Sequence, residues 1–253
     1  MRAMILAAGL GTRLRPLTND RPKALVEVGG RTLLEITLRR LASFGIREVI
    51  VNVHHFADMV VEYLSNNNNF GMRVEISREE VLLDTGGGLK KAAWFFLEAS
   101  ASGQAGKKCD SFILHNVDVI SSIDLAKMLQ FHQETKALAT LAVHQRETSR
   151  YLLFDDRGRL CGRRKGSESP EMVRGLKPSY PLAFSGVHAI SARLLPMITE
   201  DGVFSLISTY LRLARQGENL LAFRADNYYW RDLGKPESVK QAAADIERLG
   251  LEI

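Results

Sequence analysis

A short apolar run near the amino terminus, at residues 3–8, leads directly into glycines at positions 9 and 11. The run has the length and composition of a buried strand, and Gly9 ends it. A strand followed by a glycine-rich turn is how α/β proteins bind phosphate, because glycine lets several backbone N–H groups approach one anion. The beginning of the chain therefore favours an α/β fold with a phosphate-binding turn.

Strand-like and helix-like segments alternate through the first half of the chain, which is typical of right-handed crossover units. We therefore expect a Rossmann-like, mixed but mostly parallel sheet flanked by helices. The predicted strands after the first are at 48–53, 73–77 and 111–114, and the predicted helices are at 33–44, 57–64, 88–99 and 125–134.

The pattern changes after residue 137, where shorter strand-like segments surround a loop-rich stretch at 163–179. We predict a single domain over 1–253, with a crossover half at 1–136, a β-rich half at 137–253 and no β-helix domain at its end. The later elements are expected as strands at 138–143, 150–155, 159–162 and 181–189, then helices at 206–215 and 238–249.

Composition excludes several classes of protein. The net charge is only +5, and the basic residues are scattered apart from one cluster at 157–165, so we expect no nucleic-acid partner. No apolar stretch approaches the ~18 residues of a membrane span, so we expect a cytoplasmic protein without a membrane partner. The two cysteines, Cys109 and Cys161, lack metal-site spacing and are expected to be spectators.

The opening turn belongs to a longer string, G-x-G-T-R-x-x-P-x-T followed by P-K-A-L. It lacks the Gly-Lys-Ser/Thr of a P-loop, and Leu14 stands where a dinucleotide fingerprint needs its third glycine. The string resembles the signature of the sugar-1-phosphate nucleotidylyltransferases. That resemblance covers nearly the whole chain and implies a nucleotide-binding first half and a sugar-phosphate-binding second half.

The resemblance assigns roles to individual residues of this turn. Arg13 would neutralise the pyrophosphate leaving group and Lys23 would reach the α-phosphate, as suits a reaction catalysed by alignment and charge stabilisation. These two are the predicted catalytic residues. The nucleotide-binding residues implied near the turn are Ala8, Gly9, Gly11, Thr12, Arg13 and Lys23.

Two aspartates stand in further motifs of the same family. Asp118 lies in NVDV, which resembles the family's N-x-D-V, with Val117 where a small residue is more usual. Asp232 lies in WRDLGKPE, which resembles W-x-D-[IL]-G-x-P-E. The resemblance implies that both carboxylates bind one Mg²⁺, a cation that takes oxygen ligands from one or two carboxylates plus phosphates.

A second glycine-rich segment, LLDTGGGLKKA at 82–92, resembles the family's nucleobase-binding segment. Glycines would let the base edge approach the main chain, and the resemblance implies contacts from Thr85, Gly86 and Gly87. A helix start with a flexible entry is the structural alternative. The glycine-rich form is most similar to bacterial N-acetylmuramate-1-phosphate uridylyltransferases, which favours UTP.

The sugar site is less defined. The resemblance implies that Asn116, Tyr151, Gly186 and Trp230 bind the sugar phosphate, although Tyr151 and Trp230 are equally consistent with core residues. The family's Glu-Lys-Pro motif is absent, and CGRRKG stands in its place. The sequence leaves open which residue, if any, replaces the family's lysine: Arg163, Arg164 or Lys165.

The predicted reaction joins a sugar 1-phosphate to an NTP and releases pyrophosphate, with Mg²⁺ as cofactor and a monomer or small homo-oligomer as the active species. UTP with N-acetylmuramate or another hexose 1-phosphate is favoured. A guanylyl- or cytidylyltransferase acting on mannose, heptose 1-phosphate or a phospho-alcohol is the alternative. A non-catalytic nucleotide-sugar sensor is the alternative of another class.

Overall fold

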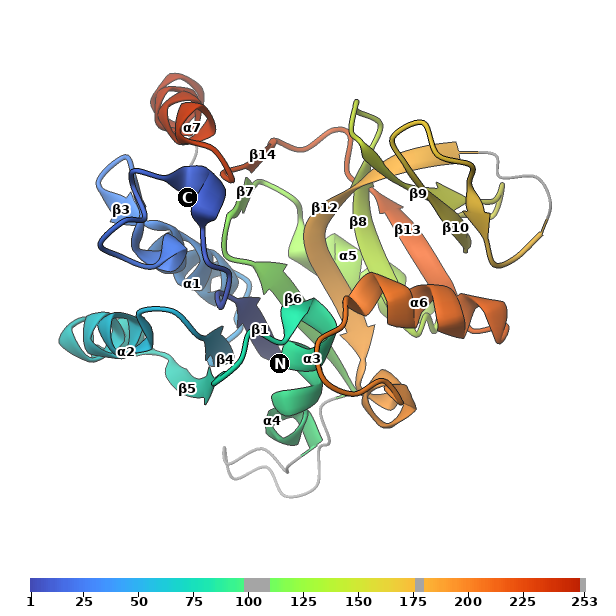
Figure 1. Cartoon of the computed structure of the whole chain (residues 1–253), viewed down its shortest axis with the longest axis horizontal. Helices are drawn as coiled ribbons and strands as arrows, with labels where there is room; N and C mark the ends of the chain where they lie inside the picture. The colour runs from blue at the N-terminus through green and yellow to red at the C-terminus, as the bar shows by residue number, and fades with distance from the viewer. Residues whose placement is uncertain (98–109, 176–179, 251–253) are drawn as a thin grey trace.

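The computed structural model describes residues 1–97, 110–175 and 180–250, and it has a mixed, mostly parallel central sheet flanked by helices, as predicted (Figure 1). The strands are β1 (Arg2–Leu6), β2 (Glu27–Val28), β3 (Arg31–Thr32), β4 (Glu48–Val53), β5 (Arg73–Arg78), β6 (Ser111–Asn116), β7 (Val119–Ser121), β8 (Ala139–His144), β9 (Arg150–Phe154), β10 (Leu160–Lys165), β11 (Glu171–Met172), β12 (Tyr180–Ser191), β13 (Leu220–Arg224) and β14 (Trp230–Asp232). The α-helices are α1 (Leu33–Ser43), α2 (Ala57–Asn66), α3 (Asp84–Lys91), α4 (Trp94–Leu97), α5 (Leu125–Glu134), α6 (Leu206–Arg215) and α7 (Pro236–Leu249). The 3₁₀ turns are η1 (Thr12–Leu14), η2 (Lys23–Leu25), η3 (Asn68–Gly71) and η4 (Ala192–Met197).

The strand order of the main sheet is β11-β10-β9-β12-β6-β1-β4-β5, with β8 and β13 attached through β12. β1 pairs in parallel with β4 on one side and with β6 on the other. The order therefore reverses between β1 and β6, and a parallel sheet opens a ligand crevice beyond the carboxyl ends of its strands at such a point. The segments that follow β1 and β6 meet there, which is where the opening turn and Asp118 lie.

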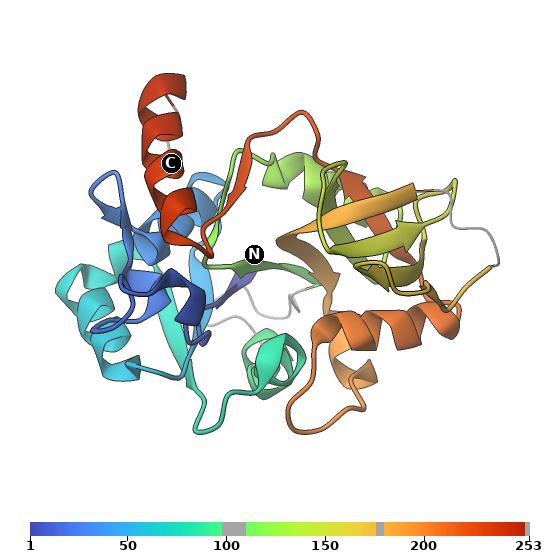
Figure 2. The same cartoon turned by 45° about the horizontal axis from the view of Figure 1, so that its top comes forward.

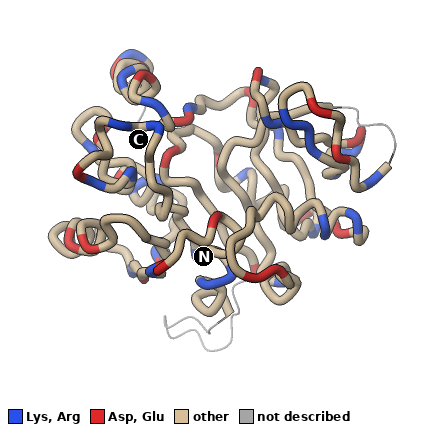
Figure 3. The backbone as a smooth tube through the Cα atoms, in the orientation of Figure 1, with Lys and Arg blue, Asp and Glu red and all other residues tan. Residues whose placement is uncertain are grey.

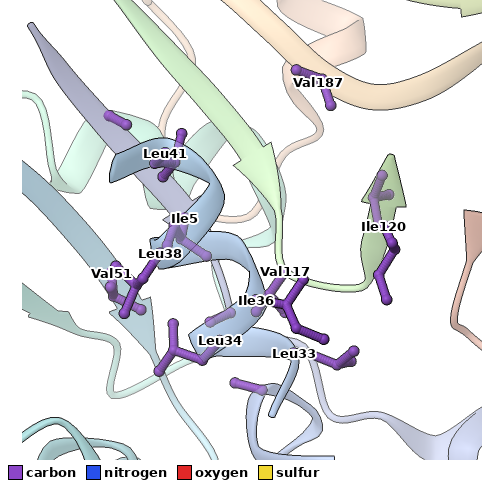
Figure 4. Close-up of a cluster of buried hydrophobic side chains, with 14 of the residues drawn as sticks. Ile5, Leu33, Leu34, Ile36, Leu38, Leu41, Val51, Val117, Ile120 and Val187 are labelled. Atoms are coloured by element: carbon purple, nitrogen blue, oxygen red, sulfur yellow. The ribbon is translucent and has the colours of Figure 1, made fainter. Parts of the chain in front are cut away.

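Side chains on the two faces of the sheet belong to two separate cores, because successive residues of a strand point to opposite faces. Ala3 and Ile5 of β1 join the cluster under α1 and α5, whereas Met4 joins the cluster under α3 and α6. Figure 4 shows the first cluster, in which Leu34, Leu38 and other side chains of α1 pack toward β1 and β4. Burial of each such side chain stabilises the fold by about 1.5–3 kcal/mol.

The second half of the chain extends the same sheet with antiparallel strands. β12 pairs with β6, β8 and β9, so it joins the two halves through one continuous strand. After β13 the chain crosses over to β7, where β14 forms a short antiparallel ladder before α7 begins (Figure 2). The strands β7, β13 and β14 were not predicted. β7 and β14 have only three residues each, which is too few to show an alternating pattern.

The largest differences from the predicted boundaries concern α3, β10 and the stretch after β10. The helix predicted at 88–99 begins earlier, at Asp84, so the glycines lie inside α3, and α4 follows separately; residues 98 and 99 lie outside the described part. The stretch predicted as loop at 163–179 begins with the end of β10 and contains β11, and residues 176–179 lie outside the described part. β10 extends further because its basic residues pair with β9.

Two further findings concern membrane-spanning helices and the cysteines. In the described ranges, no helix is long and apolar enough to cross a membrane. Cys161 is a free, buried thiol whose pKa is raised by burial, whereas Cys109 lies outside the described residues.

Candidate active site

The opening turn leaves its backbone donors free. Within the part of the chain that the structure describes, no backbone N–H from Ala8 to Arg13 donates a hydrogen bond. Gly11 has a φ of 66°, and a Cβ there would lie 3.0 Å from Thr18 Cγ2, so the turn needs glycine at this position. A run of unbonded N–H groups at the end of a strand is an anion-binding arrangement.

Lys23 lies beside this turn and donates a hydrogen bond to the carboxylate of Asp118. Both side chains are largely buried, with exposed fractions of 12% and 14%. The pair forms because η2 follows the turn while Asp118 follows β6, and β1 and β6 are neighbouring parallel strands. Each charge compensates the other in a site with little water, so removal of one would leave the other buried without its partner.

Asp232 is brought to Asp118 by the ladder between β14 and β7. Asp232 is opposite Val119 in that ladder, and the N–H of Leu233 donates to the Asp118 carbonyl at 2.8 Å. The described residues contain no group of three or more metal-ligating side chains, but Mg²⁺ is commonly held by two carboxylates and substrate phosphates. The oxygen donors of Asp118 and Asp232 therefore fit this cation.

Gly234 explains the glycine of the second aspartate motif. A Cβ at this position would lie 2.7 Å from Asp232 Oδ1 and 2.9 Å from Arg13 Nη2. The N–H of Gly234 also donates to Asp232 Oδ1 at 2.8 Å. Gly234 thus lets the Arg13 guanidinium and the Asp232 carboxylate approach the same point of the backbone.

The glycines at 86–88 serve close packing. A Cβ on Gly86 would collide with the Phe204 ring, and one on Gly87 would collide with the carbonyl of Gly202. The N–H groups of Gly86 and Gly87 both donate to the Phe204 carbonyl, at 2.9 and 3.4 Å, and Thr85 Oγ1 accepts from Leu206 N. This corrects the idea of an open glycine loop: α3 docks its first turn on the segment before α6, and the N–H groups of Gly86 and Gly87 are engaged within the protein.

A buried carboxylate that sequence reasoning missed connects the opening turn with the glycine-rich segment at 82–92. Glu79 is 5% exposed and accepts from Asn52 Nδ2 at 2.7 Å and from Leu83 N at 2.9 Å. Asn52 Oδ1 in turn accepts from Ala7 N at 2.8 Å. The Glu79–Asn52 pair therefore connects the residue before the opening turn with the entry of α3. An asparagine one residue before the end of a strand and a glutamate after the next strand were the only signals in the sequence.

The predicted sugar-site residues also come together. Gly186, with a φ of 77°, lies against Asn116, because a Cβ on it would be 3.0 Å from Asn116 Nδ2. Trp230 Nε1 donates to the Ser185 carbonyl at 2.8 Å, and its ring lies 5.8 Å from that of His144. Tyr151 is one strand further out, paired with Ala183 of β12. Both aromatic residues are only partly buried, and Trp230 also packs against the first core cluster.

Strand register separates the three basic candidates on β10. Arg164 pairs with Tyr151 and its Cζ lies 5.0 Å from the centre of that ring, so it is on the Tyr151 face of the sheet. Arg163 and Lys165 point to the opposite face because residues of a strand alternate. Arg163 also donates to Glu171 at 2.6 Å. Arg164 is thus the one of the three that the structure brings to the face shared with Tyr151 and His144 (Figure 3 shows the basic stretch of β10).

Arg146, for which the sequence had no motif, lies on the same face. Its Cζ is 4.0 Å from the centre of the Trp230 ring, and its Nη2 donates to the Phe184 carbonyl at 3.0 Å. Burial lowers the pKa of this guanidinium, and the negative charge of Asp232 acts in the opposite direction. Arg146 is therefore close enough to Asp232 to interact with its charge.

A turn with free backbone donors lies at the switch point of the sheet, beside a lysine–aspartate pair and a second aspartate from the far end of the chain. This arrangement is suited to binding phosphate groups. The family model described as Nucleotidyl transferase matches residues 2–156. The chain is also 34% identical to an N-acetylmuramate alpha-1-phosphate uridylyltransferase of Caulobacter vibrioides, over 96% of either chain. The protein belongs to the nucleotidyl transferase family.

Other relatives differ in the base and sugar that their names give. A mannose-1-phosphate guanylyltransferase of Mycobacterium tuberculosis is 28% identical, and this chain spans 64% of its length. Among solved structures, HddC from Yersinia pseudotuberculosis complexed with GMP-PN has a TM-score of 0.74 at 22% identity, covering 97% of this chain and 99% of its own. A Bacillus anthracis protein solved with sucrose has a TM-score of 0.77 at 18% identity, covering 100% and 96%. These likenesses support the same fold.

Proposed function

We propose that this protein transfers the nucleotidyl group of an NTP, with UTP favoured, to a sugar 1-phosphate, N-acetylmuramate 1-phosphate or another hexose 1-phosphate, and releases pyrophosphate. The proposal is carried by one observation: the free N–H groups of the opening turn, Lys23, Asp118 and Asp232 meet at one edge of the sheet. The cytoplasm, where nucleoside triphosphates are made, is the proposed location.

The residues divide the work of the reaction. The N–H groups of the opening turn bind the β- and γ-phosphates, and Arg13 stabilises the charge that develops on the departing pyrophosphate. Lys23 stabilises the α-phosphate as an oxygen of the sugar phosphate attacks it in line. That phosphate is already ionised at neutral pH, so no protein nucleophile is required. Mg²⁺ held by Asp118 and Asp232 would supply further positive charge to the phosphates.

The two nucleotide-binding segments support this assignment in different ways. The opening turn presents free donors to the phosphates, as described above. The base segment engages the N–H groups of Gly86 and Gly87 internally, so the contacts with the base that are proposed for Thr85, Gly86 and Gly87 would use other groups of these residues. UTP is favoured by the DTGGG form and by the 34% identity to a uridylyltransferase.

The test is pyrophosphate release from a panel of NTPs and sugar 1-phosphates, with Mg²⁺ and with a chelator. We expect UTP to give the highest kcat/KM and the chelator to abolish release. Asp118→Asn and Asp232→Asn should each lower kcat at least 100-fold, by the loss of transition-state charge stabilisation. Asp156→Asn, in an exposed turn, is the matched control. Wild-type activity in either active-site variant would refute the metal assignment.

A guanylyltransferase is the second candidate, supported by the mannose-1-phosphate guanylyltransferase relative. The same panel decides between the two, since GTP with mannose 1-phosphate would then give the highest kcat/KM. A nucleotide-sugar sensor without activity would bind nucleotide and release no pyrophosphate with any pair of substrates. A sensor would not need the proposed catalytic and metal-binding groups, and Arg13, Lys23, Asp118 and Asp232 are all retained.

A further inference from the structure

A second group of arginines lies on the face of the sheet that α6 covers, away from the candidate active site. Arg163 points to this face, because Arg164, the next residue of β10, stacks on Tyr151 on the other face. α6 packs against β10 (Figure 1), and a cavity of about 110 Å³ lies between the two elements. We call it the β10–α6 pocket. The sheet separates this pocket from the proposed reacting groups.

The helix side of the pocket presents a hydroxyl group and two guanidinium groups. Ser208, Arg212 and Arg215 all line it, since residues three and four positions apart lie on the same side of a helix. Leu211, which is 3% exposed, closes the bottom of the pocket with an apolar side chain. The donors of this wall therefore face a common space.

The strand side of the pocket is formed by a cross-strand pair. Arg163 of β10 is opposite Glu171 of β11 in the ladder between these strands, and both line the pocket. Gly162 permits this pairing, because a Cβ at that position would collide with the Glu171 carbonyl. The third cation of the pocket is thus held in place by the close approach of β11.

The three guanidinium groups differ in their partners. Arg163 Nε donates to Glu171 at 2.6 Å, and Arg212 donates through Nε and Nη2 to Glu200, at 2.9 Å each. Among the residues that the structure describes, Arg215 has no acceptor, and the Nη atoms of Arg163 have none. The pocket therefore has an excess of positive charge and several N–H donors that no protein group uses.

We propose that the β10–α6 pocket binds the phosphate group of a small molecule that is not a substrate of the reaction. A phosphate monoester is close to doubly charged at neutral pH and offers three strong acceptor oxygens. The fork of Arg215, the free edge of Arg163 and the hydroxyl group of Ser208 supply donors for these oxygens. A carboxylate carries one charge and two oxygens, so it leaves more of these donors unused.

The experiment measures the reactivity of single arginines. Phenylglyoxal modifies free guanidinium groups, and mass spectrometry of the digested protein gives the rate at each position. Saturating inorganic phosphate or glycerol 2-phosphate should slow the modification of Arg215 by about fivefold or more, relative to sodium chloride at equal ionic strength, because only the unbound fraction reacts. Arg157, exposed in a turn, is the matched control and should react at the same rate throughout. Equal rates for Arg215 in phosphate and in chloride would overturn the proposal.

The choice of probes identifies the chemistry of the ligand. Stronger protection by glycerol 2-phosphate than by inorganic phosphate supports an ester as the ligand, and the reverse supports the free anion. Acetate should protect Arg215 little. Protection by acetate that equals protection by phosphate would overturn the choice of a phosphate group.

Charge reversal locates the binding. In Arg215→Glu, the phosphate concentration that half protects Arg163 should rise about tenfold or more, the range for losing hydrogen bonds to a charged group. Arg157→Glu makes the same change in net charge and should leave that concentration unchanged. An equal rise in both variants would show general screening and would overturn the proposal. An unchanged melting temperature of Arg215→Glu shows that its fold is intact.

The pocket and the proposed function are tested independently, because the labelling requires no turnover. Protection of Arg215 in a protein that transfers no nucleotidyl group would leave the pocket proposal standing and refute the proposed function. An active protein in which phosphate does not protect Arg215 would overturn the pocket proposal alone.

Discussion

The Glu79–Asn52 pair offers a test in which the stability lost in each single variant should be recovered in the double variant. Glu79 accepts one hydrogen bond with each carboxylate oxygen, from Asn52 Nδ2 and from Leu83 N. Glu79→Gln replaces one acceptor by a donor, so a donor then faces a donor in a buried site. The expected loss in the free energy of unfolding is about 2 kcal/mol, the cost of one buried bond to a charged acceptor. Asn52→Asp alone should cost about as much or more, because it brings two buried carboxylates together.

The double variant Asn52→Asp/Glu79→Gln should recover most of this loss. The new carboxylate at position 52 accepts from Ala7 N and from the new amide at position 79, whose oxygen accepts from Leu83 N. Every donor again has an acceptor. If the singles cost about 2 kcal/mol each and the double about 1 kcal/mol, the coupling energy is about 3 kcal/mol, which is large for two residues in contact.

Urea unfolding followed by circular dichroism gives these energies. The KM for NTP gives the functional readout, and it should rise about tenfold in each single variant and return in the double, while the KM for sugar 1-phosphate stays constant. A double variant that is only as stable as the sum of the singles would show that the pair does not act as a unit. An equal rise in both KM values would show that it does not hold the nucleotide segments in particular.

Three further outcomes follow from single contacts. Gly86→Ala should destabilise the fold by about 1–3 kcal/mol in urea unfolding, because its Cβ meets the Phe204 ring, and an unchanged midpoint would contradict the close packing. Gly234→Ala should lower kcat/KM at least tenfold with a smaller change in melting temperature, since it displaces the Asp232 carboxylate; wild-type kinetics would show that this contact is not needed. Burial lowers the pKa of His132 to about 4, so the unfolded chain takes up a proton below pH 6.5 while the folded one does not. Stability present above pH 6.5 should be lost as pH falls toward 4, by about 2 kcal/mol at pH 5, and His132→Gln should flatten that part of the profile.

The parts of the site that the sequence predicts are those encoded locally. The opening turn and the two aspartate motifs carry their chemistry within a few consecutive residues, so their types and spacing can be interpreted directly. The strands and helices of the first half follow from the alternation of apolar and polar residues along the chain. β4, α5 and α6 have the predicted bounds.

What the sequence could not supply depends on distant partners. The packing of Gly86 is decided by Phe204, and the choice among the basic residues of β10 is decided by the register with β9. Arg146 belongs to no motif, and its position is recognised only from its contact with the Trp230 ring. A glutamate after a strand looks like a surface residue until the fold buries it, and for this reason Glu79 escaped sequence reasoning.

The short ladder between β7 and β14 has a consequence for folding during synthesis on the ribosome. One acid of the pair is synthesised before the middle of the chain, and the other is supplied only by β14, the last strand before α7. A nascent polypeptide that has emerged through residue 156, the end of the family match, contains the opening turn and Asp118 but lacks Asp232. The two aspartates can therefore come together only late in synthesis, when β14 pairs with β7, a strand that was synthesised about 110 residues earlier.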